Sequence, residues 1–350
     1  MIWVQLFLLT ARLVYSCDGY RILVAFPFPS KSHAILGDGV VNALAKANHQ
    51  VTYITPFPKN KVSANIREID VSGNNDIFQD PHWKVLRLVD DMSNPAYTPD
   101  AISSNIPPFT FVQRVQELAF QLGGLSLEYF TTYPIQNKAY EELLVPIIQK
   151  RGYEAPSFYD LMFNASLVLS NSHESIGKSM RLPQNFKPIG GYHISRDVKP
   201  LPENLKKLLD NAKNGVIYFS MGSNLKSKFF PEELKQSLLK MFSGLKYTVL
   251  WKFEEDLPGT PSNVHIVQWA PQQSILAHAN CILFMTHGGL LSVTEAVHFG
   301  KPIIAIPVFA DQFNNANLAV NKGFAMKVDL SYTMADDIKI AIGDILSDNK

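Results

Sequence analysis

From Gly215 onward, short apolar runs alternate with segments of helical spacing, and no other feature constrains the fold as strongly. Continuous runs rich in β-branched and aromatic residues predict strands buried on both faces of a sheet. Strands that alternate with helices predict a doubly wound parallel α/β domain. The expected strands span residues 215–220, 247–253, 264–269, 281–286 and 302–308, and the expected helices cover 231–243, the surroundings of Gln273, 290–300 and the stretch from Gln312.

The first half of the chain starts with a unit of the same kind. Two apolar runs flank a segment of helical spacing, and this pattern predicts one βαβ unit. Further along, two more apolar runs precede a polar, proline-containing stretch that reaches Pro202. The strands expected in this half span 21–26, 50–55, 165–170 and 187–192, and the helix spans 34–48.

We therefore predict two α/β lobes, an N-terminal lobe of residues 18–192 and a C-terminal lobe of residues 193–350. Between His82 and Tyr140 the pattern is irregular and rich in proline and aromatic residues. Two interpretations stay open for these aromatics, an acceptor pocket and ordinary core. They are Trp83, Tyr97, Phe109, Phe111, Phe120, Tyr129, Phe130 and Tyr133.

The first residues form an apolar run that is too short to cross a bilayer. Small residues near Ser16 suit a signal peptidase, so residues 1–17 are expected to be a secretory signal, with a buried first strand or helix as the alternative. Downstream, no 18 apolar residues follow one another, so no membrane anchor is predicted. Cys17 and Cys281 are the only cysteines, which gives no disulfide framework and no cysteine-based metal site.

The charge balance excludes two classes of partner. The chain has 32 Lys and Arg against 31 Asp and Glu, so no field would gather nucleic acid or an anionic membrane surface. Function must therefore be sought in individual sites.

The most informative site follows the expected strand 281–286. That strand runs into His287, Gly288 and Gly289, and the next helix carries Ser292 and Glu295. Glycines allow the close approach of a diphosphate, and the N–H groups at a helix start favour negative charge. Ser292 adds a hydroxyl donor, and Glu295, three residues later on the same helical face, suits the two hydroxyls of a ribose.

Three further residues complete a nucleotide-sugar site. Trp269 presents a flat face for a base, and Asp311 and Gln312 suit the hydroxyls of a sugar. Each residue alone has an ordinary alternative: a core tryptophan, a tight glycine turn or a solvated glutamate. No Asp-x-Asp sequence occurs in the chain, so we expect the helix start and amides, rather than a metal, to neutralise a leaving diphosphate.

The segment VQWAPQQSILAHANCILFMTHGGLLSVTEAVHFGKPIIAIPVFADQ resembles the signature of the UDP-glycosyltransferase family, nearest to its insect members. Residues 219–223 are similar to the loop that lies near the diphosphate in this family. The resemblance implies a two-lobed fold of the GT-B type with UDP-sugar on the C-terminal lobe. One departure is Leu291, which stands where many relatives have asparagine. The resemblance implies donor-site roles for Ser220, Gly222, Ser223, Trp269, Gln272, His287, Gly288, Gly289, Ser292, Glu295, Asp311 and Gln312.

His33 is the candidate catalytic base. It lies near a helix start after the first strand, and FPFPSKSHAILG resembles the family segment that carries the catalytic histidine. A dinucleotide-binding interpretation of Gly37-Asp38-Gly39 fails, because Asn42 occupies the third glycine position. The family also uses an aspartate to orient this histidine, and the strand that carries it has no counterpart here. Replacements to consider are Asp90, Asp91 and Asp100.

The N-terminal lobe is therefore expected to be incomplete, and the C-terminal lobe to be truncated at its end, without the membrane anchor of the family. The expected function is transfer of a hexosyl group, glucose rather than glucuronate, from UDP-sugar to a hydroxyl of a small lipophilic acceptor, with inversion. The alternative is a UDP-sugar-binding remnant, such as a splice form, that pairs with related glycosyltransferases. The resemblance places the protein in the secretory pathway, in the endoplasmic reticulum lumen, and in detoxification.

Overall fold

The computed structural model describes residues 19–26, 31–59, 61–72, 105, 108–163, 167–177, 184–195, 197–223, 225–309 and 311–347. The expected signal sequence, Trp83, Tyr97 and the three candidate aspartates lie outside the described residues. The chain divides into two compact units, one formed by Met1–Lys84 with Tyr192–Arg196, the other by Val85–Gly191 with Asp197–Lys350.

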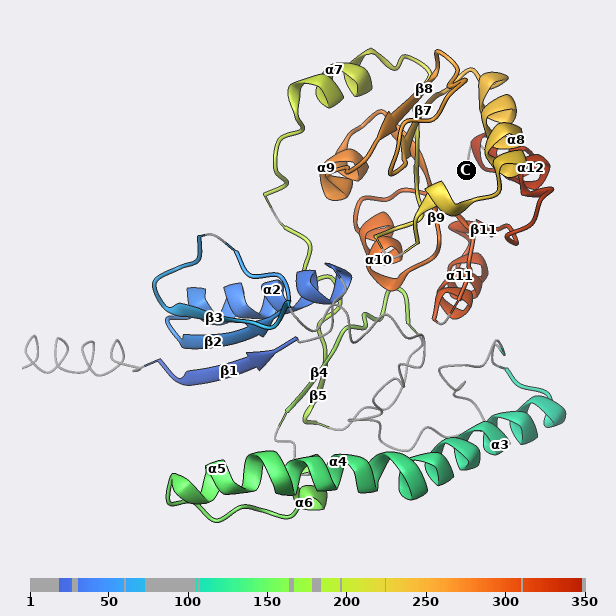
Figure 1. Cartoon of the computed structure of the whole chain (residues 1–350). Coiled ribbons are helices and arrows are strands. Elements are labelled where there is room, and N and C mark those ends of the chain that lie inside the picture. The colour runs from blue at the N-terminus through green and yellow to red at the C-terminus, as the bar shows by residue number, and fades with distance from the viewer. Residues whose placement is uncertain are drawn as a thin grey trace, which may run out of the picture. The chain divides into compact units, whose positions relative to one another are not determined.

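A six-stranded parallel sheet forms the centre of the C-terminal lobe (Figure 1). The strand order is β11-β10-β9-β6-β7-β8, so the chain runs outward from β6 on one side and outward from β9 on the other. This order defines a doubly wound sheet, as the alternating pattern predicts. The strands are β6 (Val216–Ser220), β7 (Thr248–Lys252), β8 (Val264–Val267), β9 (Cys281–Thr286), β10 (Ile303–Ala305) and β11 (Ala325–Lys327).

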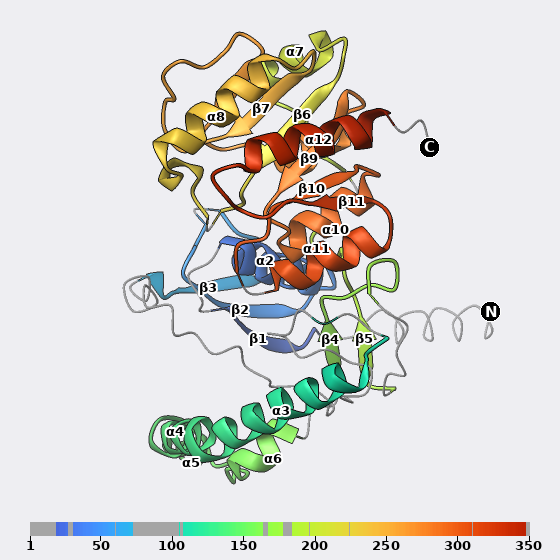
Figure 2. The ribbon, with the colours of Figure 1, turned by 90° about the vertical axis from the view of Figure 1, so that its right-hand side faces the viewer.

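Helices cover both faces of this sheet. On one face, α8 (Glu232–Ser243) and α12 (Met334–Ser347) pack in a core around Phe219 and Trp251, and Figure 2 shows both helices lying across the strands. On the other face, the core around Tyr218 and Phe284 is completed by four helices. They are α7 (Glu203–Asn211), α9 (Gln272–Ala277), α10 (Leu290–His298) and α11 (Gln312–Asn321).

Aromatic stacking fixes the two central strands. The rings of Tyr218 and Phe284, on neighbouring β6 and β9, are stacked with centroids 5.1 Å apart. On the opposite face, Phe219 stacks on Trp251 of β7, also at 5.1 Å. Such pairs add about 0.5–1.5 kcal/mol beyond the area they bury. The ends of β6, β7 and β9 are therefore held by a rigid core directly behind them.

Some expected boundaries were wrong. The expected strand 264–269 ends at Val267, so Trp269 lies in the loop beyond it. The expected strand 302–308 is reduced to Ile303–Ala305, since Pro307 has no N–H to continue the ladder. Strand β11 was not predicted, because three residues are too few to display a periodicity.

The N-terminal unit contains the predicted βαβ unit and one more strand. Its parallel sheet has the order β1-β2-β3, built from β1 (Arg21–Ala25), β2 (Gln50–Thr55) and β3 (Ile66–Asp70), with α2 (Lys31–Lys46) following β1. Charged residues in β3, IREID, hid it from the apolar pattern. Its core is small and consists of Val24, Val41, Val51 and Tyr53.

Residues 111–150 are helical, although the sequence pattern between His82 and Tyr140 is irregular. A capping box in which Thr110 and Gln113 bond reciprocally starts α3 (Phe111–Leu127), and this signal was overlooked. Pro134 and Pro146 stand in the first turns of later helices, each where a π-helical turn gives way to an α-helix. Those helices are α4 (Tyr133–Ala139) and α5 (Val145–Lys150), joined by the π-helical turns η2 (Glu128–Thr132) and η3 (Tyr140–Leu144) and followed by α6 (Phe158–Phe163).

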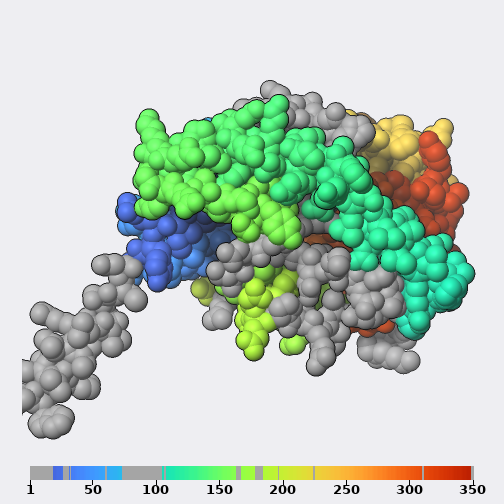
Figure 3. All heavy atoms as spheres, turned by 90° about the horizontal axis from the view of Figure 1, so that it is seen from below, coloured from blue at the N-terminus to red at the C-terminus, as the bar shows by residue number. Residues whose placement is uncertain are grey.

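The aromatic residues of this helical segment divide into two groups. Phe109 and Tyr140 are buried, whereas Phe111, Tyr129 and Phe130 are exposed on the segment, which is coloured teal to green in Figure 3. Phe109 and Tyr140 therefore belong to the core, and an acceptor pocket lined by the exposed rings stays a prediction.

Two of the strands expected in the first lobe pair with each other. Strands β4 (Val168–Ser170) and β5 (Phe186–Pro188) form a two-stranded parallel sheet, which among the described residues has no hydrogen-bonded pairing with β1–β3. Within the same described ranges, no helix has the length and apolar character needed to span a membrane.

Candidate functional site

The polar residues predicted from the sequence gather at the carboxyl edge of the C-terminal sheet. Strands β6 and β9 are neighbours, yet β6 leads on to β7 and β9 leads on to β10, so the strand order reverses between them (Figure 2). Ligands of open α/β sheets bind in the crevice at such a reversal. The two strands end at Ser220 and Thr286, directly before the predicted glycine-containing loops.

His287 lies between two glycines. A Cβ atom at Gly222 would be 2.5 Å from the His287 Cε1 atom, and one at Gly289 would be 2.5 Å from Nε2. Gly222 also has φ +81°, a backbone conformation that side chains disfavour. The Thr286 Oγ1 atom lies 3.3 Å from the Nδ1 atom of the ring. Both glycines are therefore required by the close approach of the imidazole.

His287 is neutral at physiological pH. Burial, with the nearby positive charge of Lys252 as a second cause, lowers the pKa of His287 to about 4. A neutral ring has one nitrogen that donates and one that accepts, and Thr286 stands beside Nδ1. The imidazole of His287 can therefore contact a ligand by hydrogen bonding, but not as a positive charge.

The start of α10 is open to a ligand. Its N-cap is Gly289, which has no side chain to accept from the first helical N–H groups. Gly288 has φ +79°, and a Cβ there would meet the Gln312 carbonyl oxygen at 3.2 Å. The nine-residue helix therefore directs unsatisfied N–H groups and the positive end of its dipole at the same edge.

A buried polar network lies beside this helix start. The Gln272 amide donates to the Glu295 carboxylate at 2.6 Å and to the Ser292 hydroxyl at 3.2 Å. Gln273 donates to the other carboxylate oxygen at 3.0 Å, and the Tyr218 hydroxyl donates to Gln272 Oε1 at 3.4 Å. Ser292 and Glu295 are only 7% and 6% exposed, so the carboxylate depends on these donors. Sequence reasoning missed Gln273, which only the turn of α9 brings to the same carboxylate.

Trp269 stands in the loop after β8, with 58% of its surface exposed. The Nζ atom of Lys252 lies 6.0 Å from the centroid of its ring. An exposed indole beside a buried polar network is suited to stacking on a planar base.

Asp311 and Gln312 differ in their surroundings. Gln312 is buried, and its Oε1 atom accepts from the N–H groups of Val308 and Phe309 at 2.9 and 3.1 Å. Its side-chain oxygen therefore shapes the loop before α11, a role that the sequence did not predict. Asp311 is exposed and accepts from Asn315 at 2.8 Å, and Asn315 also donates to the Gly288 carbonyl at 3.0 Å. Asp311 thus belongs to the same edge as His287.

Sequence reasoning also missed Lys252, the last residue of β7. Its ammonium group donates to the Gly222 carbonyl at 2.9 Å and pairs with Glu254 at 2.7 Å. In the sequence it stands in an apolar run, YTVLWKF, where nothing marks it as part of a site.

His33 has the position that the sequence predicts within its own unit. It is the third residue of α2, after β1, and its side chain is exposed. A Cβ at Gly37 would lie 2.4 Å from the Tyr53 hydroxyl, and one at Gly39 would lie 2.9 Å from the Tyr192 ring. These glycines are therefore needed for packing, consistent with rejecting a dinucleotide site.

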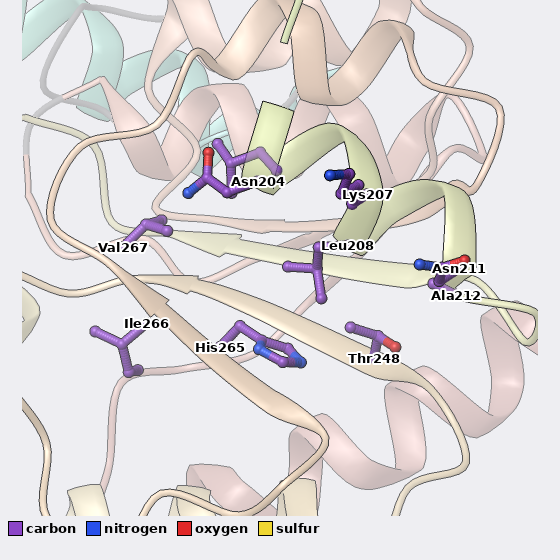
Figure 4. A pocket seen from close by; sticks show the side chains of 10 residues that line it. Asn204, Lys207, Leu208, Asn211, Ala212, Thr248, His265, Ile266 and Val267 are labelled. Carbon is purple, nitrogen blue, oxygen red and sulfur yellow. The ribbon is translucent and has the colours of Figure 1, made fainter. Parts of the chain in front are cut away.

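A separate cavity of about 520 Å³ lies where α7 meets the outer strands of the C-terminal sheet (Figure 4). Leu208, His265 and Val267 are among its lining residues, and burial lowers the pKa of His265. None of the predicted donor residues lines this cavity. It is distinct from the edge that carries the network.

Comparison with known proteins decides the family. Residues 27–350 match the family described as UDP-glucoronosyl and UDP-glucosyl transferase. The chain belongs to this family. UDP-glucosyltransferase 2 of Dactylopius coccus is 30% identical over 415 aligned positions, which cover 96% of this chain and 79% of that protein. UDP-glucuronosyltransferase 2B1 of Rattus norvegicus is 28% identical over 258 positions, covering 73% of this chain and 46% of that protein.

The fold of this UDP-glycosyltransferase is also that of solved glycosyltransferases. The calicheamicin glycosyltransferase superimposes with a TM-score of 0.58 at 16% identity, covering 95% of this chain and 90% of that structure. The two-lobed, parallel-sheet architecture predicted from the sequence is confirmed.

Gly289→Ala tests the fit of the imidazole in this glycosyltransferase. The backbone of Gly289, at φ −61°, tolerates alanine, so the added methyl acts only by displacing His287. We expect UDP affinity, measured by isothermal titration calorimetry, to fall about tenfold, with about 1–2 kcal/mol lost from the free energy of unfolding. Gly343→Ala in α12 is the control, because nothing lies within 4 Å of its Cβ position. Unchanged UDP affinity in Gly289→Ala would contradict the packing described.

The depressed pKa of His287 makes stability depend on pH. An unfolded histidine binds its proton near pH 6.5, whereas His287 in the folded state does so only near about 4. The unfolded state therefore binds more protons as the pH falls from about 6.5, and the folded state loses up to roughly 3 kcal/mol by the time the pH passes about 4. Urea unfolding of wild type and His287→Asn over this range measures the difference. Curves that run parallel from neutral to acid pH would refute the effect.

Proposed function

We propose that the C-terminal lobe binds a UDP-sugar, and that the chain transfers the hexosyl group to a hydroxyl of a small lipophilic acceptor. The observation that carries this proposal is the buried network of Gln272, Gln273, Ser292 and Glu295 beside the open start of α10. The network offers a carboxylate to a ribose, and the helix start offers N–H groups to a diphosphate. Membership of the family supports the same donor.

The proposed reaction uses His33 as a general base. The imidazole takes the proton of the acceptor hydroxyl while the oxygen attacks the anomeric carbon of the sugar. A new carbon–oxygen bond forms, and the bond to UDP breaks, with its electron pair leaving on the diphosphate. Attack from the face opposite UDP inverts the anomeric centre. The α10 dipole and the adjoining N–H groups stabilise the charge that develops on the leaving group.

Glucose is the proposed sugar. The insect relative that covers 96% of this chain is named a glucosyltransferase, although the rat relative is named a glucuronosyltransferase. We call the carboxyl edge of the C-terminal sheet, which carries His287 and the Glu295 network, the donor edge. Among the described residues, Asp311 is an exposed carboxylate at this edge, and it would repel the carboxylate of glucuronate. Binding of UDP-glucose in preference to UDP-glucuronate, measured by calorimetry, tests this choice.

A second candidate is a donor-binding remnant that does not catalyse transfer. The alignment with the insect relative spans 415 positions, so at least 65 positions of that relative have no counterpart in the 350 residues of this chain. This difference in length favours a shortened lobe that lacks the partner of His33. Such a chain would act by holding UDP-sugar or by pairing with related glycosyltransferases.

We propose the secretory pathway, and the endoplasmic reticulum lumen within it, as the location. The support is the apolar run of residues 1–17. Expression in insect cells followed by N-terminal sequencing tests it, because a removed leader gives a mature chain that starts near Cys17. A chain that retains Met1 would contradict the proposal.

One experiment separates transfer from binding alone. The purified chain is incubated with UDP-glucose and a phenolic acceptor, and glycoside formation is followed by mass spectrometry while UDP binding is measured in parallel. Binding together with a glycoside supports the transferase. Binding without a glycoside, reversed by inserting the missing segment from a longer relative, supports the remnant. A chain that binds no UDP would refute both.

A further inference from the structure

Lys252 is a buried cation that the proposed mechanism does not yet use. It is 7% exposed and stands at the carboxyl end of β7, beside the donor edge. Burying an ammonium group is costly unless it is hydrogen-bonded and paired, and here the Gly222 carbonyl and the Glu254 carboxylate serve both purposes. A well-packed apolar side chain often replaces a buried ion pair without loss of stability, so stability alone does not account for this lysine.

The bond from Lys252 orients one peptide of the predicted diphosphate loop. In a trans peptide, the carbonyl and the following N–H point in opposite directions. Because the Gly222 carbonyl points at Lys252, the N–H of Ser223 points away from it. On the other side of the same residue, the Gly222 N–H donates to Ser220 Oγ at 3.3 Å. Hydrogen bonds to Lys252 and to Ser220 thus hold Gly222 on both sides, and the Ser223 N–H points away from Lys252.

Glu254 extends this anchor to the far part of the loop. One carboxylate oxygen pairs with Lys252 at 2.7 Å, and the other accepts from the Lys228 N–H at 3.2 Å. The segment after β6 is therefore fixed at Gly222 and again at Lys228, both through the end of β7. The two side chains that anchor this segment are shielded from solvent, because the side chain of Lys252 is 8% exposed and that of Glu254 is 16% exposed.

The same ammonium group adjoins two more parts of the donor edge. It lies 6.0 Å from the ring centroid of Trp269, and its charge acts on His287. One cation thus connects the loop, the exposed indole and the imidazole. Because the Glu254 carboxylate pairs with this ammonium group, Lys252 acts on the loop through its hydrogen bond to the Gly222 carbonyl.

We propose that Lys252 is a positioning residue for the diphosphate of the nucleotide sugar, which holds the Gly222–Ser223 peptide so that the Ser223 N–H donates to a phosphate oxygen. This inference rests on the proposed donor site and adds to it the groups that bind the diphosphate. The proposal requires that the loss of Lys252 lower the affinity of a ligand more when the ligand carries more phosphates. Uridine depends on Trp269 and Glu295 and should not depend on Lys252.

The test measures the affinities of UDP, UMP and uridine for wild type, Lys252→Met, Lys252→Gln and Lys252→Arg by calorimetry. For Lys252→Met we expect UDP affinity to fall about tenfold or more, UMP affinity to fall less, and uridine affinity to stay within about twofold. Lys252→Arg keeps charge and donors and should recover most of the UDP affinity. Lys252→Gln keeps one donor without the charge and should fall between the two.

Lys301→Met is the matched control. Lys301 is also partly buried and also donates to a main-chain carbonyl, that of His278 at 3.2 Å, but it precedes β10 at the amino edge of the sheet. It should lose some stability and no UDP affinity. Equal losses for UDP and uridine in Lys252→Met, or no loss for UDP, would overturn the proposal.

A measurement on the unaltered chain guards against a variant that does not fold. In amide NMR spectra, the Ser223 resonance should shift on addition of UDP and stay in place on addition of uridine. If UDP binds but the Ser223 amide resonance shifts with neither ligand, the proposed role of Lys252 is overturned while the donor site stands. A wild-type chain that binds no UDP would overturn the donor site itself, so the two failures are distinguishable.

Discussion

Glu295→Ala should reduce UDP affinity by a factor of a hundred or more. The buried carboxylate accepts from Gln272 and Gln273 and is the acceptor proposed for the two ribose hydroxyls. Hydrogen bonds to a charged group contribute about 1.5–3 kcal/mol each, so losing two of them accounts for a loss of about two orders of magnitude or more. The alanine variant also leaves two buried amides without their acceptor. Calorimetric titration with UDP measures the loss directly.

Thr294→Ala is a control on the same helix. Thr294 is 8% exposed and donates only to the Leu290 carbonyl within α10. It should leave UDP affinity unchanged. Glu295→Gln keeps the shape of the side chain but removes the charge, and should give an intermediate loss. Retention of wild-type affinity in Glu295→Ala would show that the nucleotide does not use this network.

His33→Ala should reduce the rate of sugar transfer by about a hundred- to ten-thousandfold, the range that a general base contributes. UDP affinity should stay within about twofold of wild type, because every residue proposed to contact UDP lies in the C-terminal lobe. Initial rates of glycoside formation at saturating UDP-glucose, with UDP titrations in parallel, measure both quantities.

His49→Gln is the control for His33, since His49 stands before β2 and accepts from the Tyr20 N–H at 3.2 Å. It should leave the transfer rate unchanged. Equal rates for His33→Ala and wild type would exclude His33 as the base. If wild type binds UDP but forms no glycoside, the comparison moves to a chain carrying the missing segment, where the loss in His33→Ala should appear.

The C-terminal lobe was predictable because its strands are buried on both faces and so read as continuous apolar runs. Parallel strands also bring their carboxyl ends to one edge, which is why residues as distant in sequence as Ser220, Gln272 and Glu295 were correctly expected to gather there. The aromatic richness of residues 111–150 hid a helical segment whose capping box alone signalled its start.

The residues that sequence reasoning missed share a physical reason. Lys252, Gln273 and the structural role of Gln312 depend on partners that are distant in the sequence or on main-chain groups, which have no sequence signature. For a lysine in an apolar run, the sequence reveals the charge but not the groups that the ammonium group will bond. That it bonds to the carbonyl of Gly222, thirty residues away in the chain, follows from the pairing of β6 with β7.

The network around Glu295 has a consequence for turnover. Gln272 and Gln273 each donate to one oxygen of its carboxylate, at 2.6 and 3.0 Å. Each carboxylate oxygen can accept a second hydrogen bond, so the two ribose hydroxyls add to the amides rather than replace them. Because the amides and not the nucleotide fix the direction of the carboxylate, the acceptor for the ribose keeps its position from one turnover to the next.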